Sequence, residues 1–377
     1  MRTSHRNPSP ARFQHAAPLA ITLAAVVGLT GCLPGSGRKN DRDLSPADSA
    51  SIELAATVPV DTLALAWTAR APEDDPMPLP TSLGWMDDGR LAVVETQVGS
   101  IRIFGADSTY QDRIDLPEQS YPYFAGAAGD AVAVLARGTG SVLWAVPGDG
   151  VVREVSVGEG ALNAWATSPD GGTISVRFGG GTSDDPAEVQ QLDAEGRPLR
   201  TVPLPNAWRA SGFVRGWGAF TTVALSGYRP VVDLIQDQRA DTLALQGFDS
   251  PQLPRSAQFM RGDANEPPLL TSSADALGDH LYVLNLRGDH VRVDVYGRDG
   301  VLQRILVSPR PWQVLQHVAL DISARRQADG TVELAVLMQR SRGVIQPADA
   351  FLVLYRWRPE VLGDSDSTSV QEATPQP

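Results

Sequence analysis

An all-β fold built from a repeated four-stranded unit is predicted by three observations on this 377-residue chain. Short runs rich in Val, Leu, Ile and Tyr recur along it, separated by turns containing Gly, Asp or Pro, as in strands joined by tight turns. Acidic turns recur at positions 107, 149, 195, 237 and 299. Residues 61–65 (Asp-Thr-Leu-Ala-Leu) repeat residues 241–245 letter for letter.

The second strand of each unit is the clearest, and it often follows an Asp/Gly turn. These strands are expected at 91–95, 131–135, 173–177, 220–225, 280–284 and 332–337. A third strand leads into the acidic turn, and a fourth strand, often bearing arginine, follows. The acidic turns are 42, 46, 42 and 62 residues apart, and the longest interval contains a Pro-rich insertion at 251–268. Four strands in about 45 residues are typical of a β-propeller blade.

The ends of the repeat predict how the ring closes. Five units are complete, whereas the sixth, around 318–357, ends after its third strand. Because residues 61–65 match the fourth strand of another unit, we expect an N-terminal strand to complete the last blade and cover its exposed edge. The sequence therefore predicts a six-bladed β-propeller over 57–359, with seven blades or a pair of β-sandwiches as alternatives.

One turn adds a family resemblance. Residues 168–171 (Ser-Pro-Asp-Gly) resemble the turn common in TolB-like blades, and residues 60–359 resemble six-bladed propellers of the NHL and TolB-like kind. The resemblance implies the same fold, with ligands bound on one face of the ring.

The N-terminus has the composition of an export signal. Residues 1–15 carry Arg2, Arg6 and Arg12 without an acid, and 16–28 are apolar and small, which is typical of a secretory signal peptide. The apolar run is shorter than the ~20 residues that span a bilayer. The predicted signal peptide is 1–31, and an uncleaved membrane anchor is the alternative.

Cys32 is the single cysteine of the chain and follows Leu29-Thr30-Gly31. This run resembles the lipobox of bacterial lipoproteins. The resemblance implies cleavage before Cys32, acylation of its thiol and anchoring in a lipid bilayer. Leu33 after the cysteine favours the outer membrane by the same analogy, with the domain facing the periplasm or the outside. Residues 32–56 are expected to form a flexible tether, and 360–377 a disordered tail.

Charge excludes one class of partner. The whole chain carries a formal charge of −12, and removal of 1–31 takes away three arginines and brings it to −15. Such a chain does not bind nucleic acid nonspecifically. It is also repelled by anionic lipid headgroups, so acyl chains would have to hold it at a membrane.

No catalytic signature is present in the sequence, and we predict no catalytic residue, metal site or cofactor. It has no His-Glu-x-x-His, Gly-x-Ser-x-Gly or P-loop motif. After residue 31 the histidines are His280, His290 and His317, of which His317 is the better site candidate. The acidic pairs are interpreted as solvated turns rather than calcium ligands; they are 74–75, 87–88 and 184–185.

Arginine recurs at or just beyond the end of the second strand in five of the six units. These residues are Arg137, Arg177, Arg229, Arg287 and Arg340. Second strands of a propeller end on one face, so the five would form a positive ring for a carboxylate or phosphate. A chain rich in arginine would also place arginine at strand ends without a binding role. Aromatic residues expected on the same face, such as Tyr121 and Tyr123, are typical interface anchors.

The sequence thus favours a noncatalytic binding or scaffold lipoprotein. Its propeller would hold an envelope protein or an anionic envelope ligand. A metal-dependent hydrolase or lactonase is the alternative, because some six-bladed propellers hydrolyse esters around a central metal. Glu95 and Asn285, at the ends of second strands, are its candidate ligands. A purely structural envelope protein also remains open.

Overall fold

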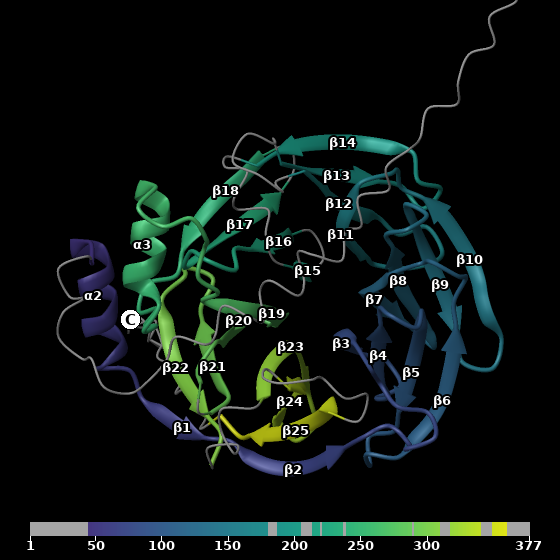
Figure 1. The fold of residues 1–377 in the computed structure, drawn as a ribbon, viewed down its shortest axis with the longest axis horizontal. Helices are drawn as coiled ribbons and strands as arrows, with labels where there is room; N and C mark the ends of the chain where they lie inside the picture. The colour runs from purple at the N-terminus through teal and green to yellow at the C-terminus, as the bar shows by residue number, and fades with distance from the viewer. Residues whose placement is uncertain are drawn as a thin grey trace, which may run out of the picture.

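The computed structural model describes residues 44–179, 187–204, 213–218, 221–236, 239–288, 290–309, 317–340 and 349–359. Six sheets surround a central axis, each with four antiparallel strands running from the axis to the rim (Figure 1). The predicted six-bladed β-propeller of four-stranded blades is confirmed.

The first three blades follow the chain without interruption. Blade one contains β3 (Pro80–Trp85), β4 (Leu91–Glu95), β5 (Ser100–Phe104) and β6 (Tyr110–Asp115). Blade two contains β7 (Pro122–Ala128), β8 (Ala131–Ala136), β9 (Ser141–Val146) and β10 (Gly150–Ser156). Blade three contains β11 (Ala161–Ala166), β12 (Ile174–Phe178), β13 (Glu188–Leu192) and β14 (Pro198–Pro203).

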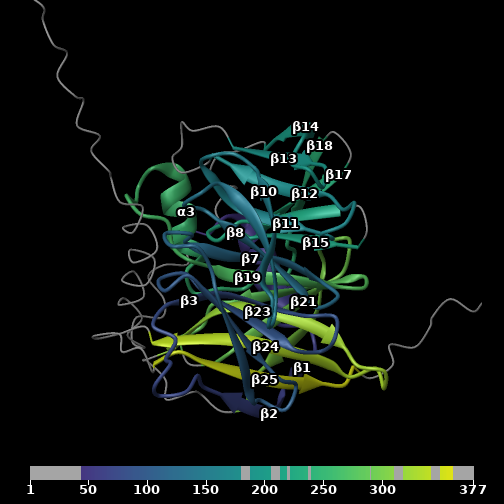
Figure 2. The same ribbon diagram turned by 90° about the vertical axis from the view of Figure 1, so that its right-hand side faces the viewer.

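The remaining blades include an insertion and the chain closure. Blade four contains β15 (Val214–Trp217), β16 (Thr221–Leu225), β17 (Val231–Gln236) and β18 (Arg239–Ala244). Blade five contains β19 (Thr271–Leu277), β20 (His280–Asn285), β21 (Arg292–Tyr296) and β22 (Leu302–Val307). Blade six contains β23 (His317–Arg326), β24 (Val332–Arg340) and β25 (Phe351–Trp357). Its hairpin of β23 and β24 has the longest strands and extends beyond the ring (Figure 2).

All six expected second strands are present, as β4, β8, β12, β16, β20 and β24. They are mostly apolar and mostly buried because both faces of a blade pack against neighbouring blades. Every residue of β4 and β8 is buried. The outer strands have one solvated face, as the mixed burial of β10 and β14 shows.

The N-terminal segment closes the ring, although in two pieces rather than the one expected at 61–65. β1 (Val60–Thr62) adds a fifth strand to blade five, parallel to β22. β2 (Ala64–Ala69) then pairs with β25 and is the fourth strand of blade six. The chain changes sheet at Leu63, whose N–H donates to the carbonyl oxygen of Val307 at 2.8 Å.

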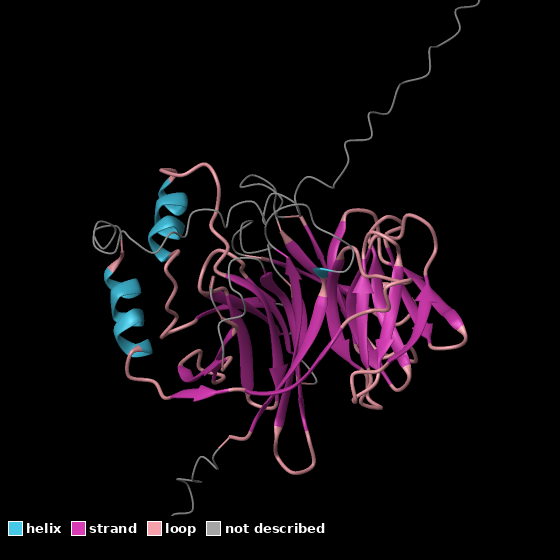
Figure 3. Cartoon of the chain, turned by 60° about the horizontal axis from the view of Figure 1, so that its bottom comes forward, coloured by secondary structure: helices cyan, strands magenta, loops and turns pink. Residues whose placement is uncertain are grey.

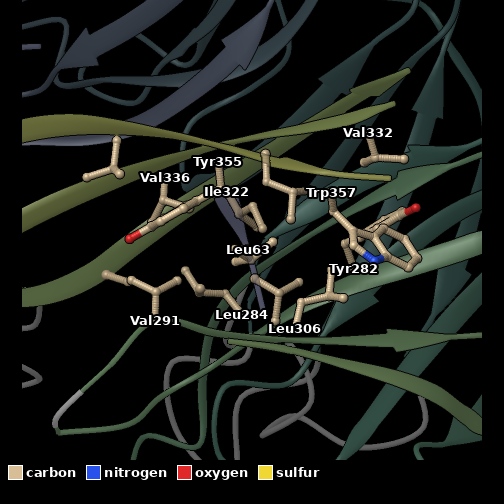
Figure 4. Packing of buried hydrophobic residues seen from close by; sticks show 14 of the residues in the cluster. Leu63, Tyr282, Leu284, Val291, Leu306, Ile322, Val332, Val336, Tyr355 and Trp357 are labelled. Atoms are coloured by element: carbon tan, nitrogen blue, oxygen red, sulfur yellow. The ribbon is translucent and has the colours of Figure 1, made fainter. Parts of the chain in front are cut away.

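Leu63 lies inside a large apolar cluster between blades five and six (Figure 4). Its partners come from both sheets and include Tyr282, Leu306 and Tyr355. The Trp357 indole N–H donates to the Asp61 carboxylate at 2.9 Å. Closure therefore depends on buried apolar area as well as on strand pairing.

Two helices lie side by side beyond the outer strands of blades four and five (Figures 1 and 3). α3 (Leu253–Arg261) belongs to the Pro-rich insertion. α2 (Pro46–Ala55) begins at Ser45, which forms a capping box with Asp48. The prediction of a flexible tether over 32–56 is therefore wrong for 46–55, because Ile52 and Ala55 join the core of blades four and five. Within the described residues, no helix is long and apolar enough to cross a membrane.

Candidate functional site

The ends of β8 and β12 bring two predicted arginines together, and we call Arg137 and Arg177 the arginine pair. An irregularity in β11 at Leu162 shifts its register against β12. Arg137 Nε donates to the carbonyl oxygen of Leu162 at 2.8 Å. Arg177 lies opposite the next residue, Asn163, in the sheet. Arg137 thus reaches this bulge with its side chain, and Arg177 lies beside it by its position in the sheet.

The environment of the arginine pair disfavours its positive charges. Burial, together with the charge of Arg137, lowers the pKa of Arg177 to about 9. Burial also lowers the pKa of Arg137. Within the described residues, no carboxylate pairs with Arg137. Two neighbouring like charges, one buried at Arg177 and one half-buried at Arg137, make the site favourable for an anion.

Aromatic groups border the arginine pair. The guanidinium carbon of Arg137 lies 3.4 Å from the ring centroid of Tyr123, which is a close cation–π contact. Tyr121, two residues earlier, is 38 % exposed and has a φ of 45°. Gln119 in the same loop also has a positive φ, 60°. Left-handed non-glycine residues cost about 1–3 kcal/mol each and concentrate at binding sites.

The other predicted arginines do not join this pair. Arg287 forms an ion pair with Asp249 at 2.9 Å, and Arg292 shares the same carboxylate at 3.0 Å. Arg340 lies 3.4 Å from Asp349. Arg229 follows β16, and its backbone N–H donates to Ser226 Oγ. Arg287 and Arg340 therefore each lie beside an aspartate carboxylate, unlike Arg137.

A polar cluster that sequence reasoning missed fills the axis of the ring. Arg215 of β15 reaches past β19 and pairs with Asp321 of β23 at 3.2 Å. The same carboxylate accepts hydrogen bonds from the backbone N–H of Leu83 at 2.8 Å and from Ser273 Oγ. Arg215 also lies 5.8 Å from the ring centroid of Phe124. Groups from blades one, four, five and six thus meet at the buried Asp321 carboxylate, and we call this cluster the axial plug.

A second buried carboxylate, that of Asp275, also links the inner strands β19 and β23. Asp275 of β19 accepts hydrogen bonds from Ser323 Oγ and the Ala324 N–H. The indole N–H of Trp85 donates to the carbonyl oxygen of Ser323 at 3.2 Å. Burial raises the pKa of both Asp275 and Asp321. No sequence motif marks these residues, because they come from the inner strands β3, β15, β19 and β23, which are far apart in the sequence.

The two candidate ligands of the hydrolase alternative are engaged in structural hydrogen bonds. The carboxylate of Glu95 accepts from the backbone N–H groups of Leu79 and Gln97. The amide of Asn285 donates to the Asp249 carbonyl oxygen and to the Asp294 carboxylate. They belong to blades one and five and form no common site. In the described part of the chain, no cluster of three His, Cys, Asp or Glu side chains could hold a metal ion.

The remaining candidates have structural partners or lie outside the described residues. Asp75 pairs with Arg102 and Arg113, and Asp88 pairs with Arg90. His280 contacts Gln303. The ring of His317 packs edge-on against Phe351, and burial lowers its pKa. Cys32, residues 184–185 and the tail at 360–377 lie outside the described residues.

Comparisons with known proteins support the fold. No protein-family model and no curated protein matches the sequence. A streptogramin B lyase structure has a TM-score of 0.51 at 10 % identity, covering 77 % of this chain and 98 % of its own. Virginiamycin B lyase from Staphylococcus aureus has a TM-score of 0.48 at 12 % identity, over 76 % and 98 %. Regucalcin, a calcium-binding protein from Agrobacterium tumefaciens, has a TM-score of 0.47 at 11 % identity, over 78 % and 95 %.

At such low identity the similarity defines the fold and not the activity. The ring of six sheets and the first of these structures together make this chain a six-bladed β-propeller protein.

Proposed function

We propose that this chain is an exported lipoprotein whose propeller is a noncatalytic binding module for an anionic group of an envelope protein or envelope ligand. The arginine pair carries the binding part of this proposal. The run ending at Cys32 carries the lipid anchor, with the outer membrane as the expected location.

The arginine pair has the properties of a carboxylate or phosphate site. Guanidinium groups grip such anions with paired N–H donors. An anion bound at Arg137 and Arg177 would relieve the repulsion between the two cations, of which Arg177 is 5 % exposed. Tyr121 beside the pair offers an exposed aromatic surface of the kind that anchors protein partners. The net negative charge elsewhere on the chain makes this positive spot selective.

The hydrolase alternative has less support. Its candidate residues, Glu95 and Asn285, are held by backbone and carboxylate partners in separate blades. The axial plug also occupies the centre of the ring, where the ion pair of Arg215 and Asp321 is contacted by groups from other blades. Ester hydrolysis by the purified chain that is lost on chelation would overturn the noncatalytic proposal.

The test uses the full-length lipoprotein in its own cells. Chemical crosslinking, detergent extraction, pull-down and mass spectrometry would compare the wild type with Arg137→Gln and with Arg239→Gln. Arg239 is an exposed arginine on the outer strand β18 and serves as the matched control. We expect one partner that is retained by Arg239→Gln and lost by Arg137→Gln. Equal recovery with both variants would contradict a role for the arginine pair.

A second readout separates a small ligand from a protein partner. Phosphate and citrate should raise the melting temperature of the wild type relative to chloride at equal ionic strength, and Arg137→Gln should remove the difference. A Cys32→Ala variant should appear in the soluble envelope fraction. Its persistence in the membrane fraction would contradict the lipid anchor while leaving the binding result intact.

A further inference from the structure

The N-terminal helix α2 is attached to one edge of the propeller. The Ser51 hydroxyl donates to the carbonyl oxygen of Phe248 at 3.1 Å. Ala55 lies in the buried cluster that contains Phe248, and Leu44 and Ile52 pack against that cluster. The chain is therefore held to the edge formed by α2, α3 and blades four and five from Leu44 onward. We call this edge the helical edge.

The attachment limits how far the helical edge can lie from a lipid on Cys32. Twelve peptide units connect Cys32 to Leu44, and a fully extended chain of that length spans at most about 40 Å. If α2 were detached, as the sequence predicts for a flexible tether, the limit would be about 90 Å from Cys32 to Pro59. Docking of α2 thus shortens the reach by about half.

Comparing the maximum length of the segment 32–44 with the width of the domain shows which side of the ring can face the bilayer. A domain of about 300 residues has a radius of gyration near 19 Å and is about 50 Å across. β10 of blade two lies on the opposite side of the ring from α2 (Figure 1). If β10 faced the bilayer, Leu44 would have to lie about 50 Å from it, which is beyond the reach of about 40 Å.

We propose that docked α2 orients the propeller, with the helical edge facing the bilayer and blade two, whose β8 leads to Arg137, facing away from it. This inference rests on the proposed lipid anchor at Cys32. The partner of the helical edge is the lipid bilayer itself. A partner bound at the arginine pair would then approach from the side opposite the membrane.

Single introduced cysteines can measure this orientation. Cys32 is the single native cysteine and acylation consumes its thiol, so Met260→Cys or Val152→Cys carries the one free thiol. Met260 on α3 is 41 % exposed and Val152 on β10 is 53 % exposed, which makes them a matched pair of label sites. The lipidated chain, purified in detergent, is labelled with a donor dye and reconstituted into vesicles with acceptor-labelled headgroups.

We expect energy transfer to be several-fold higher from position 260 than from position 152. Ile52→Asp, which places a charge in the α2 contact, should reduce this difference, whereas Glu53→Gln on the exposed side of α2 should not. Insertion of 30 Gly/Ser residues after position 43 should equalise the two labels without altering the domain. Equal transfer from both positions in the unmodified lipoprotein would overturn the orientation.

Flotation of the vesicles distinguishes failure of the orientation from failure of the anchor. If the wild-type chain and Cys32→Ala both stay at the bottom of the gradient, the lipid anchor is wrong. The lipoprotein part of the proposed function then fails as well. If the wild type floats and the labels report equal distances, the anchor stands and the orientation alone is wrong.

Discussion

Arg215 of blade four and Asp321 of blade six form an ion pair across the axis of the ring, with 3.2 Å between Nη2 and Oδ2. Their side chains are 4 % and 0 % exposed. The pair passes blade five and joins elements that are 106 residues apart in the chain. The ion pair therefore fixes the relative positions of the inner strands β15 and β23, which belong to non-adjacent blades.

Removing one partner of the axial plug should be costly. Asp321→Ala leaves the buried guanidinium of Arg215 without its carboxylate, and we expect a loss of about 3–5 kcal/mol in the free energy of unfolding. The double variant Arg215→Met, Asp321→Leu should recover most of that loss, because no charge stays buried. Urea unfolding of the single and double variants measures the coupling. Purely additive losses would contradict the pairing.

Arg177 and Arg287 should respond differently to removal of their charge. Arg177→Met should abolish the anion-dependent rise in melting temperature, because it removes one of the two guanidinium groups of the proposed site. Arg287→Met should destabilise the fold by about 1–3 kcal/mol, because it removes a partner of Asp249. Anion binding by Arg287→Met should be unchanged. Loss of stability in Arg177→Met without loss of binding would contradict the proposed site.

Closure predicts a sharp contrast between two neighbouring leucines. Leu63→Ala should cost about 2–5 kcal/mol, because Leu63 is 1 % exposed in the cluster between blades five and six. Leu65 on β2 is 49 % exposed, and Leu65→Ala should cost well under 1 kcal/mol. Equilibrium unfolding of both variants provides the comparison. Similar losses would mean that strand pairing, rather than the buried cluster, closes the ring.

The packing of blades one and two predicts a clash at Gly84. A Cβ on this glycine would lie 1.9 Å from the ring of Phe124, so Gly84→Ala should cost about 1–3 kcal/mol through overpacking. Phe124→Leu in the same chain should relieve part of that cost. Melting temperatures of the two single variants and the double variant test this. A fully stable Gly84→Ala would show that the inner strands of these blades can separate.

The ion pairs of Asp75 should contribute a pH-dependent part of the unfolding free energy in acid. Hydrogen bonds from Arg102 and Tyr110 and the charge of Arg113 lower the pKa of Asp75 to about 2. Since the folded pKa is below the unfolded value, the stabilisation is complete above about pH 4 and is lost as the pH falls toward 2. Asp75→Asn should lose about 2–3 kcal/mol at pH 7 and little near pH 2. A constant difference between the two proteins over this range would contradict the assignment.

The buried acids Asp275 and Asp321 should change the unfolding free energy with pH in the opposite direction to Asp75. Burial raises the pKa of Asp275 and Asp321, so their contribution to stability increases as the pH falls below the folded values. The comparison of wild type with Asp75→Asn removes this background, because both proteins keep those residues.

The local pattern of the sequence determined the strands, their order and the ring. Apolar runs such as 91–95 and 131–135 are buried on both faces as β4 and β8 because a blade packs on both sides, and this pattern is visible without any tertiary information. The repeated five letters at 61–65 indicated closure correctly. They did not show that the chain would change sheets at Leu63, because packing between blades five and six decides that point.

Only the tertiary structure decided which polar residues act together. Strand-end position alone predicted the five arginines, but Arg287 pairs with Asp249, which lies between β18 and α3, whereas Arg137 lies near Arg177. The ion pair between Arg215 and Asp321 cannot be predicted from the sequence pattern, because it joins two distant strands and has no periodic spacing. The segment at 46–55 likewise is a helix in the structure, where Ala55 joins the apolar cluster of blades four and five and Ile52 packs against it. Strand periodicity is local and can be read along the chain, while charge pairing and docking depend on distances that exist only after the ring has closed.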